Sequence, residues 1–422
     1  MKKLSVRSQI EILGSPPSFV RLVKPCAVGD GIVSLSGENK KLHRQTYDKK
    51  RLDYRVCVFV PASGAASRMF ADLTARDSGA LEEFTRNIKR FAFYEDLQIA
   101  CARLRRSDVS SLAPDEIAEL VLSAQGLGYE GFPKGLVKFH RYDGVSTTAF
   151  EDYSQLARAY ADEIHFTVPT GFSDEEKNRL TQSGDGFTVS FSTQDPRTDT
   201  VVLDSDGNLL TDENGETVLR PAGHGALLEN FGAVEADVVF ISNIDNIAHA
   251  SRMKNPESDR KALAGVLIEE MEKTPQDKPF RVCGVVKNTG EPGGAPFWVR
   301  DSSGCVSKRI VESVEVNHSD SAQEKVWCSA THFNPVDMVC SVRGADGRKF
   351  NLQNYTDDSF MVADKTFQGR PIKALEMPGL WNGAMAGWET VFVEIPVESF
   401  NPVKNIFDLL SDCHQDLQSE RN

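Results

Sequence analysis

The stretch "RVCVFVPASGAASRMF", residues 55–70, decides the fold that the sequence predicts. Its first part, residues 55–60, is β-branched and aromatic, which is typical of a buried strand. Its second part is rich in small residues and leads to Arg68, so the chain leaves the strand through a loop that can expose backbone N–H groups. Such a loop suits a phosphate or another anion. A plain turn is the alternative, and these residues alone leave both interpretations open.

The composition is that of an ordinary globular protein. The 422 residues are 40% hydrophobic and 26% charged, with a formal net charge of −13. This balance allows two or three domains or one elaborated α/β domain, and it argues against nonspecific nucleic-acid binding. No apolar run is long enough to span a bilayer, and the N-terminus is not typical of a signal peptide. The eight cysteines are scattered without a CxxC pair, so we expect reduced thiols in a cytoplasmic protein.

The order of the predicted elements indicates the architecture. Residues 71–130 look helical and predict an insertion directly after the first loop. Strand-like and helix-like stretches then alternate, as in "GLVKFH", "AFEDYSQLARAYAD" and "IHFTVP", which predicts an α/β fold with a mixed, mostly parallel central sheet flanked by helices. We expect an N-terminal extension over residues 1–54, a catalytic domain over 55–400 and a C-terminal helical tail over 401–422.

Three further loops carry residues with binding chemistry. Lys134, in "FPKG", offers a compact positive charge to a phosphate. Gly223, His224 and Gly225 again leave backbone N–H groups open before a helical stretch. Asp245 follows the very apolar run "DVVFIS", where a desolvated carboxylate needs a partner such as magnesium. A surface lysine, a capping histidine and a turn-forming aspartate are the respective alternatives, and they stay open.

A last group of polar residues lies toward the C-terminal end. Its members are Glu312, Asn334, Asp337, Lys373, Glu376 and Asn382. Each is explained, if taken singly, as a solvated strand end or a turn residue. Loops that follow the strands of an α/β sheet gather at its carboxyl edge, where ligands bind. The order of these segments is therefore more informative than any single residue.

Taken in order, the segments resemble those of the pyrophosphorylases, which are sugar nucleotidyltransferases with a GT-A-like (Rossmann-like) fold, and most closely their uridylyltransferase branch. "SGAASR" resembles the glycine-rich loop, "FPKGLV" the Pro-Lys-Gly element, "PAGHGAL" the nucleoside loop and "NIDN" the metal-binding strand end. "IVES" and "FN" follow in the order of the sugar-binding elements, and "IKALE" in that of a later lysine segment. An uncharacterised bacterial family of domains of unknown function is closer still, because its pattern includes "RPxGHGAL", "NIDN" and "LWNGAM".

The resemblance implies a Mg²⁺-dependent reaction that joins a nucleoside triphosphate, UTP favoured, to a sugar 1-phosphate and releases pyrophosphate. It implies no nucleic-acid or membrane partner and leaves the oligomeric state open. The implied nucleotide-binding residues are Ala62, Ser63, Gly64, Ala65, Ser67, Gln194, Gly223, His224 and Gly225. The implied catalytic residues are Arg68, Lys134 and Lys373, the sugar-binding residues Glu312 and Asn334, and the metal ligands Asp245 and Asn382.

Two departures from the family's pattern bear on this assignment. Ala65 and Ala66 stand where the loop usually has a glycine or a threonine, and their methyl groups limit how near the backbone comes to a triphosphate. Arg68 and Lys134 lie far apart in the sequence, although we expect them to face one pocket with the helical insertion beside it. Two other functions therefore stay open, a noncatalytic nucleotide- or nucleotide-sugar-binding protein and a glycosyltransferase of the GT-A fold.

Overall fold

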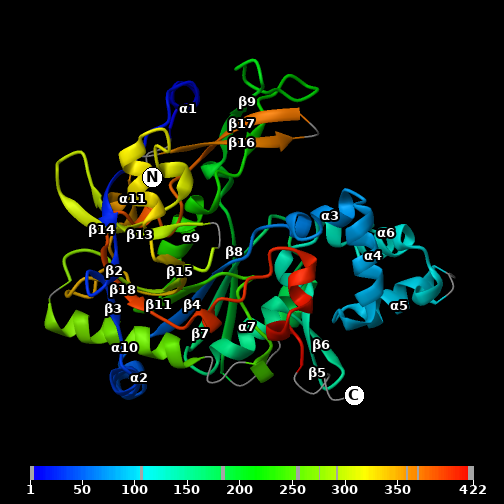
Figure 1. Ribbon diagram of the computed structural model, residues 1–422, viewed down its shortest axis with the longest axis horizontal. Coiled ribbons are helices and arrows are strands. Elements are labelled where there is room, and N and C mark those ends of the chain that lie inside the picture. The colour runs from blue at the N-terminus through cyan, green and yellow to red at the C-terminus, as the bar shows by residue number, and fades with distance from the viewer. Residues whose placement is uncertain are drawn as a thin grey trace. The chain divides into compact units, whose positions relative to one another are not determined.

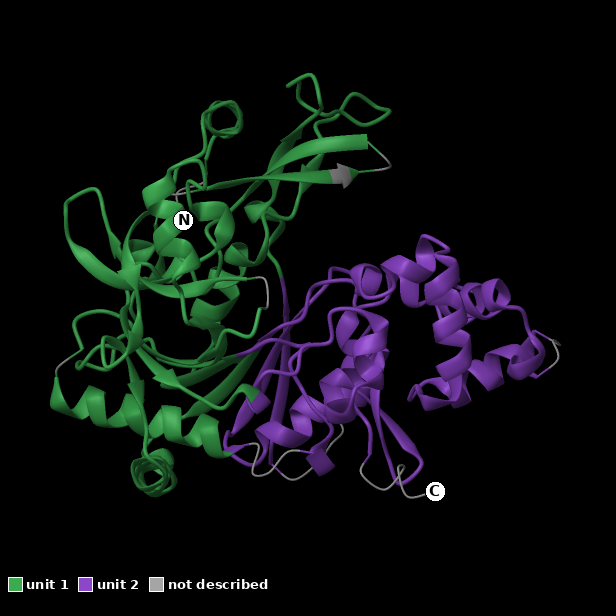
Figure 2. Ribbon diagram, viewed as in Figure 1, with its two compact units in different colours: residues 1–59, 194–241, 258–397 green, residues 60–193, 242–257, 398–422 purple. Residues whose placement is uncertain are grey.

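The computed structural model describes residues 4–104, 108–181, 186–252, 257–274, 276–290, 293–357, 360–367 and 370–416 (Figure 1). The chain forms two compact units, which Figure 2 distinguishes by colour. Unit 1 comprises residues 1–59, 194–241 and 258–397, and unit 2 comprises residues 60–193, 242–257 and 398–422. The last six residues of the expected C-terminal tail lie outside the described part.

The large sheet of unit 1 is mixed and mostly parallel. Its strands lie in the order β2 (Ala27–Val28), β3 (Gly31–Ser34), β18 (Glu389–Glu394), β12 (Phe280–Lys287), β15 (His332–Ser341), β11 (Val238–Ser242) and β4 (Val56–Pro61). The pairs β2–β3, β3–β18, β18–β12 and β11–β4 are parallel, whereas β15 runs antiparallel to β12. This confirms the predicted fold class.

Two smaller sheets and several helices complete unit 1. The sheets are β1 (Arg21–Pro25), β13 (Ala295–Arg300) and β14 (Val306–Val311), and β10 (Leu219–Arg220), β9 (Thr200–Leu203), β17 (Arg370–Glu376) and β16 (Met361–Phe367). The α-helices are α1 (Val6–Leu13), α2 (Gly37–Lys50), α9 (Leu228–Ala233), α10 (Glu257–Lys273) and α11 (Ser321–Cys328). Residues 1–54 therefore supply strands to the large sheet of unit 1.

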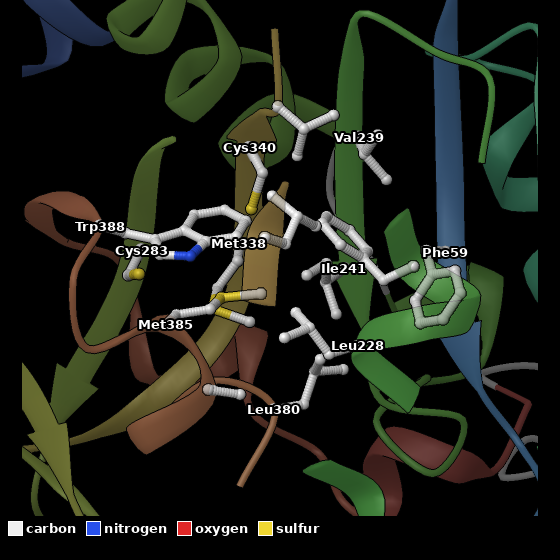
Figure 3. Close-up of a cluster of buried hydrophobic side chains, with 14 of the residues drawn as sticks. Phe59, Leu228, Val239, Ile241, Cys283, Met338, Cys340, Leu380, Met385 and Trp388 are labelled. Carbon is white, nitrogen blue, oxygen red and sulfur yellow. The ribbon is translucent and has the colours of Figure 1, made fainter. Parts of the chain in front are cut away.

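Helices cover both faces of the large sheet. Successive residues of a strand point to opposite faces, so neighbouring residues of β12 contact different helices. Cys283 of β12 belongs to a buried cluster with Leu228 and Phe231 of α9, part of which is shown in Figure 3. The next residue, Gly284, faces the other side, where an added Cβ would lie 3.1 Å from Leu263 of α10. The sheet is thus buried on both faces, which explains the continuous apolar runs in its strand sequences.

Unit 2 begins at the end of β4. Its strands are β5 (Lys138–Tyr142) and β6 (Val145–Thr148), which form an antiparallel hairpin, and the parallel pair β7 (Glu163–Val168) and β8 (Thr188–Thr193). Its helices are α3 (Ala71–Thr74), α4 (Ser78–Asn87), α5 (Tyr94–Arg103), α6 (Pro114–Leu122), α7 (Ala149–Ala157) and α8 (Asp174–Thr181). Helix α7 begins at a capping box in which the Thr148 hydroxyl and the Glu151 carboxylate each accept a backbone N–H of the other residue.

The predicted helical insertion consists of α3 to α6 with short 3₁₀ turns between them. Residues 401–422 were expected to form a C-terminal helical tail. Their described part, up to residue 416, forms short 3₁₀ turns at Ile406–Leu410 and Asp412–His414 instead of an α-helix. None of the helices in the described residues is long and apolar enough to cross a membrane.

Candidate functional site

The loop that follows β4 in unit 2 leaves its backbone donors open. Among the described residues, none accepts a hydrogen bond from the backbone N–H groups of Ser63, Gly64, Ala65 and Ser67. The loop is held at its start, where Ala62 N–H donates to the Thr167 carbonyl of β7 at 3.0 Å. Open backbone N–H groups at such a turn can bind an anion, which is the role that the sequence predicts for this loop. We call residues 62–68 the phosphate loop.

The two alanines of the phosphate loop behave differently. Ala66 is fully buried, so its methyl group points into the core and away from any bound anion. Ala65 is exposed, so its methyl group stays on the surface of the loop. Only one of the two added methyl groups therefore limits the approach of a phosphate.

The phosphate loop and the Pro-Lys-Gly segment lie side by side, although the insertion separates them in sequence. The Lys134 N–H donates to the Gly64 carbonyl at 3.1 Å, and the Ala66 N–H donates to the Phe132 carbonyl at 2.8 Å. These bonds form an antiparallel bridge between Ala65 and Pro133. The Arg68 side chain is exposed and forms no ion pair with any described residue. The loops that carry both predicted cations are thus joined, while a common pocket for the two charged groups stays a prediction.

An aromatic cluster packs the helical insertion against the phosphate loop. Tyr129, at the end of the insertion, contacts Phe70, Phe93 and Phe132 with ring centroids 5.6, 5.4 and 5.5 Å away, respectively. Phe70 lies two residues after the end of the phosphate loop and is fully buried. The insertion therefore lies beside the loop, and its last residues lead straight into Lys134.

Asp245 and Lys134 form a partly buried ion pair in unit 2. The Lys134 Nζ lies 2.9 Å from Asp245 Oδ2, and the two side chains are 15% and 14% exposed. Lys404, which the sequence analysis did not single out, contacts the same oxygen at 3.2 Å. Burial alone would raise the pKa of Asp245, but the two ammonium groups outweigh it and hold this pKa below its usual value. Burial lowers the pKa of Lys134, and the Asp245 carboxylate opposes that shift.

Lys404 belongs to a C-terminal segment that crosses this ion pair, and we call residues 398–416 the C-terminal strap. Its Val403 carbonyl accepts a hydrogen bond from Lys134 Nζ at 2.6 Å, and its Val403 N–H donates to the Asp245 carbonyl at 3.0 Å. The Ile406 N–H donates to the Met69 carbonyl at 2.9 Å, next to the phosphate loop. The strap therefore fixes both predicted phosphate and metal residues and adds a lysine of its own.

The second glycine-rich loop, residues 222–225 of unit 1, is packed closely against residues 376–381. A Cβ on Gly225 would lie 2.0 Å from the Pro378 carbonyl oxygen, so only glycine fits there. The His224 Nδ1 accepts the Leu380 N–H at 3.0 Å, which leaves Nε2 as the protonated nitrogen of the neutral ring. The His224 ring also stacks on Trp381, with centroids 4.6 Å apart.

Acidic and amide residues of the predicted sugar site gather near His224 in unit 1. Burial lowers the pKa of His224, and the nearby Glu312 and Glu376 carboxylates oppose this shift. Glu312 and Asn334 meet at Gly294, where an added Cβ would lie 3.3 Å from Glu312 Cγ and 2.8 Å from Asn334 Oδ1. The structure thus brings together side chains from four segments that are distant in sequence.

The other predicted residues of unit 1 do not form one cluster, and each has its own surroundings. Asn382 is 1% exposed, and neither atom of its amide has a hydrogen-bond partner among the described residues. Gln194 donates to Thr198 Oγ1 at 3.2 Å. Lys373 is exposed on β17 and, by the alternation of a strand, points to the opposite face from Glu376. Asp337 is buried in an ion pair with Arg260, which supports its structural interpretation.

These environments allow a metal ion only a sparse protein ligand set. The described residues contain no group of three or more histidine, cysteine or acidic side chains that could hold a metal ion. In unit 2, both lysines contact Asp245 Oδ2. The other carboxylate oxygen, Oδ1, accepts no hydrogen bond within the described part of the chain. Mg²⁺ typically binds one or two carboxylates and completes its octahedron with water and phosphate oxygens. Asp245 fits such a site when a phosphate ligand is present.

The sequence matches the family described as "Domain of unknown function (DUF4301)" over residues 1–276 and 270–415. The chain belongs to this family. No protein with curated annotation matches the sequence.

The fold of this DUF4301 member is similar to that of solved pyrophosphorylases. The uridine diphosphate N-acetylglucosamine pyrophosphorylase from Trypanosoma brucei has a TM-score of 0.54 and 14% identity, covering 96% of this chain and 74% of that chain. The putative UDP-N-acetylglucosamine pyrophosphorylase from Entamoeba histolytica has a TM-score of 0.50 and 14% identity, covering 90% of this chain and 83% of that chain. At this identity the similarity establishes the fold.

Two residues that contribute to the candidate site were missed in the sequence. Lys404 lies in "FNPVKN". The only signal for a role in that segment is a lysine that follows a proline and a valine, which is a weak pattern. Glu315 follows Glu312 by three residues and accepts its N–H at 2.7 Å. Burial raises the pKa of Glu315 to about 7. In the sequence Glu315 is one of two glutamates in "VESVEV", and nothing in that pattern indicates that it is the buried one.

Proposed function

We propose that the protein is a Mg²⁺-dependent nucleotidyltransferase that joins a nucleoside triphosphate, UTP favoured, to a sugar 1-phosphate and releases pyrophosphate. The observation that carries this proposal is the phosphate loop of unit 2, where open backbone N–H groups adjoin Lys134 through the hydrogen bond from Lys134 N–H to the Gly64 carbonyl. The fold shared with two UDP-N-acetylglucosamine pyrophosphorylases supports the same reaction class.

The reaction requires alignment and charge more than side-chain chemistry. An oxygen of the sugar phosphate attacks the α-phosphorus in line, a new P–O bond forms there, and the bond to the β-phosphate oxygen breaks. The phosphate loop and Arg68 would hold the β- and γ-phosphates that leave as pyrophosphate. Lys134 would neutralise charge that develops between the α-phosphate and the leaving group.

Lys134 must change partners in this scheme, since its ammonium group contacts the Asp245 carboxylate and the Val403 carbonyl. A triphosphate offers Lys134 a stronger anionic partner. Lys404 contacts the same Asp245 oxygen and could bind the triphosphate as well. Two ammonium groups contact the Asp245 carboxylate, and the Asp408 carboxylate also acts on Lys134. The two ammonium groups beside Asp245 favour a polyphosphate and disfavour a free cation.

Magnesium would therefore bind together with the nucleotide, where it would screen the phosphate charge and polarise the α-phosphate. Asp245 would hold it through Oδ1. Asn382, which the sequence suggested as a second ligand, lies in unit 1, where its amide oxygen is buried without a partner among the described residues. Gln194 would contact the base and ribose, and Glu312 and Asn334 the sugar hydroxyls. The Gly223–Gly225 loop, which packs against Pro378, and Lys373, which points to the opposite face from Glu376, have no ligand contact in this scheme.

The test is a screen of the purified protein with the common nucleoside triphosphates and a panel of sugar 1-phosphates, with Mg²⁺, in which pyrophosphate is measured. Production of pyrophosphate that depends on both substrates supports the proposal. Sugar transfer from a nucleotide sugar without pyrophosphate would identify a glycosyltransferase. Thermal stabilisation by nucleotides without turnover of any sugar phosphate would identify a binding protein.

A further inference from the structure

A chain of three buried side chains lies in unit 2 at the end of the C-terminal strap. The Asp152 Oδ2 lies 2.7 Å from His140 Nδ1, and His140 Nε2 lies 3.0 Å from His414 Nδ1. Exposed fractions are 7% for Asp152, 1% for His140 and 2% for His414. Asp152 is fixed in turn by the Thr147 hydroxyl, which donates to Oδ1 at 2.7 Å. None of these residues has a role in the proposed reaction.

The same chain of hydrogen bonds joins the strap to the rest of unit 2. His140 lies on β5 and Asp152 on α7, whereas His414 lies ten residues after Lys404 on the strap. A second contact secures the same end, because the His249 N–H donates to the Cys413 carbonyl at 2.8 Å. Whatever holds His414 in place therefore also holds the segment that brings Lys404 and the Val403 carbonyl to Asp245 and Lys134.

We propose that Asp152, His140 and His414 form a proton-sensitive anchor that docks the C-terminal strap and thereby positions Lys404 and the Val403 carbonyl. The three residues are positioning residues, since they act through the strap. The consequence for turnover rests on the proposed function, while the docking of the strap does not.

The geometry explains why the anchor responds to protons. The nitrogens of His140 and His414 that face each other at 3.0 Å have room for one proton between them. Two protonated rings would place two N–H groups and two positive charges head to head. When the strap leaves, the His414 ring is free to take up a proton. The docked state therefore holds fewer protons than the released state, and acid favours release.

Other titratable and charged groups surround the anchor, and the Asp416 carboxylate opposes the lowering of the His249 pKa that burial causes. His249 lies edge-on to His140 with centroids 5.5 Å apart and stacks on Tyr142 at 4.3 Å. Burial lowers the pKa of His249 and raises that of Tyr142. Asp416 on the strap faces both of these residues. Arg252 is held by the Gln415 carbonyl, which accepts from its Nε at 2.8 Å.

The strap's own histidine sets the pH range. Burial, and then the neighbouring His140, lower the pKa of His414 to about 3, against an ordinary value of 6.5. A histidine whose pKa is lowered on docking contributes fully above its free pKa and loses that contribution as the pH falls toward the docked pKa. Docking should therefore weaken by about tenfold for each pH unit below 6.5.

Amide hydrogen exchange of the strap in the full chain tests this anchor without any substrate. The reporters are the Asn401, Val403 and Ile406 amides, which donate to groups outside the strap, compared at pH 7.5 and 5.5 after correction for intrinsic exchange. We expect protection in the parent to fall by about tenfold at pH 5.5. Protection that is unchanged between the two pH values would overturn the proposal.

Two variants of His414 separate the effect of its hydrogen bond to His140 from the effect of its protonation. His414→Phe removes both and should lower protection by at least fivefold at pH 7.5, with no further loss at pH 5.5. His414→Asn keeps a donor near the Nδ1 position but does not titrate, so its protection should stay within about threefold of the parent at pH 7.5 and be flat with pH. An Asn variant as unprotected as the Phe variant, or a Phe variant as protected as the parent, contradicts the anchor.

His165→Phe is the matched control. His165 is a partly buried histidine of the same unit, its pKa is lowered to about 4 by burial, and its ring nitrogens bond to Ser190 and Ser192 and not to the strap. This variant should keep the parental protection of the strap and its pH dependence. Equal loss in the control would show a general destabilisation of unit 2 and overturn the specific role of His414.

A nucleotide titration then separates this inference from the proposed function. If the parent binds UTP, His414→Phe should weaken binding about as much as Lys404→Ala, and the double variant should show no further loss. Additive losses would contradict positioning through the strap. If the parent binds no nucleotide, the proposed function fails, and hydrogen exchange alone decides the anchor.

Discussion

The phosphate loop of unit 2 and the His224 loop of unit 1 (residues 222–225) have similar sequences and opposite structures. Both place small residues between a strand and a short 3₁₀ turn. Around Gly64 the space is open, since an added Cβ would have no neighbour within 4 Å. Around Gly225 it is closed, since the same atom would lie 2.0 Å from the Pro378 carbonyl. The first loop leaves backbone donors for a ligand, whereas the second uses its glycines for close packing.

This difference shows that glycine in such a loop has two physical meanings. In the phosphate loop it allows a ligand to approach the backbone, and in the His224 loop it allows another protein segment to approach. The second use places His224 against Trp381 and near Glu312 and Glu376. A Gly-rich loop in the sequence is therefore evidence for a close approach, but not for the identity of what approaches.

A pair of alanine substitutions should separate the two loops most clearly. Gly225→Ala forces a methyl group against a backbone carbonyl and should lower the free energy of unfolding by about 3 kcal/mol. Gly64→Ala meets no atom and should change it by less than about 0.5 kcal/mol. Urea unfolding of both variants provides the measurement. Equal losses would show that the two loops are packed alike.

Asp245→Asn tests the phosphate side of the comparison. Loss of a group that orients charge in the transition state should lower turnover by about a hundredfold or more. Because Lys134 and Lys404 also lose their carboxylate partner, the melting temperature should fall modestly as well. Turnover and melting temperature are compared with those of Asp204→Asn, an aspartate that only accepts backbone N–H groups in a turn. Near-parental turnover would assign Asp245 to an ion-pair role without catalysis.

Glu315→Gln tests the buried acidic residues near the His224 loop through the pH dependence of protein stability. Burial raises the pKa of Glu315 to about 7, so the folded protein keeps this proton between about pH 4.5 and 7 while the unfolded chain loses it. The stability contribution of this group is therefore present at low pH and is lost as the pH rises through that range. Relative to the glutamine variant, the parent should lose on the order of 2 kcal/mol between pH 5 and 8. Parallel stability curves for the two proteins would place Glu315 in contact with water.

Lys404→Ala should have the smallest effect, because the Lys404 side chain is 66% exposed whereas that of Lys134 is 15% exposed. We expect about a tenfold loss of nucleotide affinity that shrinks at high salt, and a larger loss for Lys134→Ala. Isothermal titration with UTP and Mg²⁺ at two salt concentrations measures both. A greater loss for Lys404→Ala would mean that the strap, and not the Pro-Lys-Gly segment, carries the main phosphate contact.

Local sequence patterns were sufficient for the first core strand, the insertion and the loop between them, but not for the strands within residues 1–54. The run at residues 55–60 is a buried strand, and the small residues after it form an open loop. The aromatic residues of the insertion, read only as a helical pattern, also pack it beside that loop through Tyr129. These features depend on neighbours in the chain, so a periodic pattern is enough to predict them.

The pairing of Asp245 could not be predicted in the same way. The sequence showed that its carboxylate, at the end of an apolar strand, needs a cation, and we expected magnesium. The structure supplies two lysines, one of which comes from a segment more than a hundred residues later. The partner of a desolvated charge depends on which distant segment crosses it, and no local pattern carries that information.

The sequence by itself determined the alternation of strands and helices, the positions of the two glycine-rich loops and the chemistry that each loop could support, because these follow from hydrophobic periodicity and backbone freedom. Only the tertiary structure decided which loop stays open, which alanine methyl group is buried, and that His140 and Asp152 meet His414 of the C-terminal strap. Those outcomes depend on contacts between segments far apart in the chain, where packing and burial, and not local propensity, set the free energy.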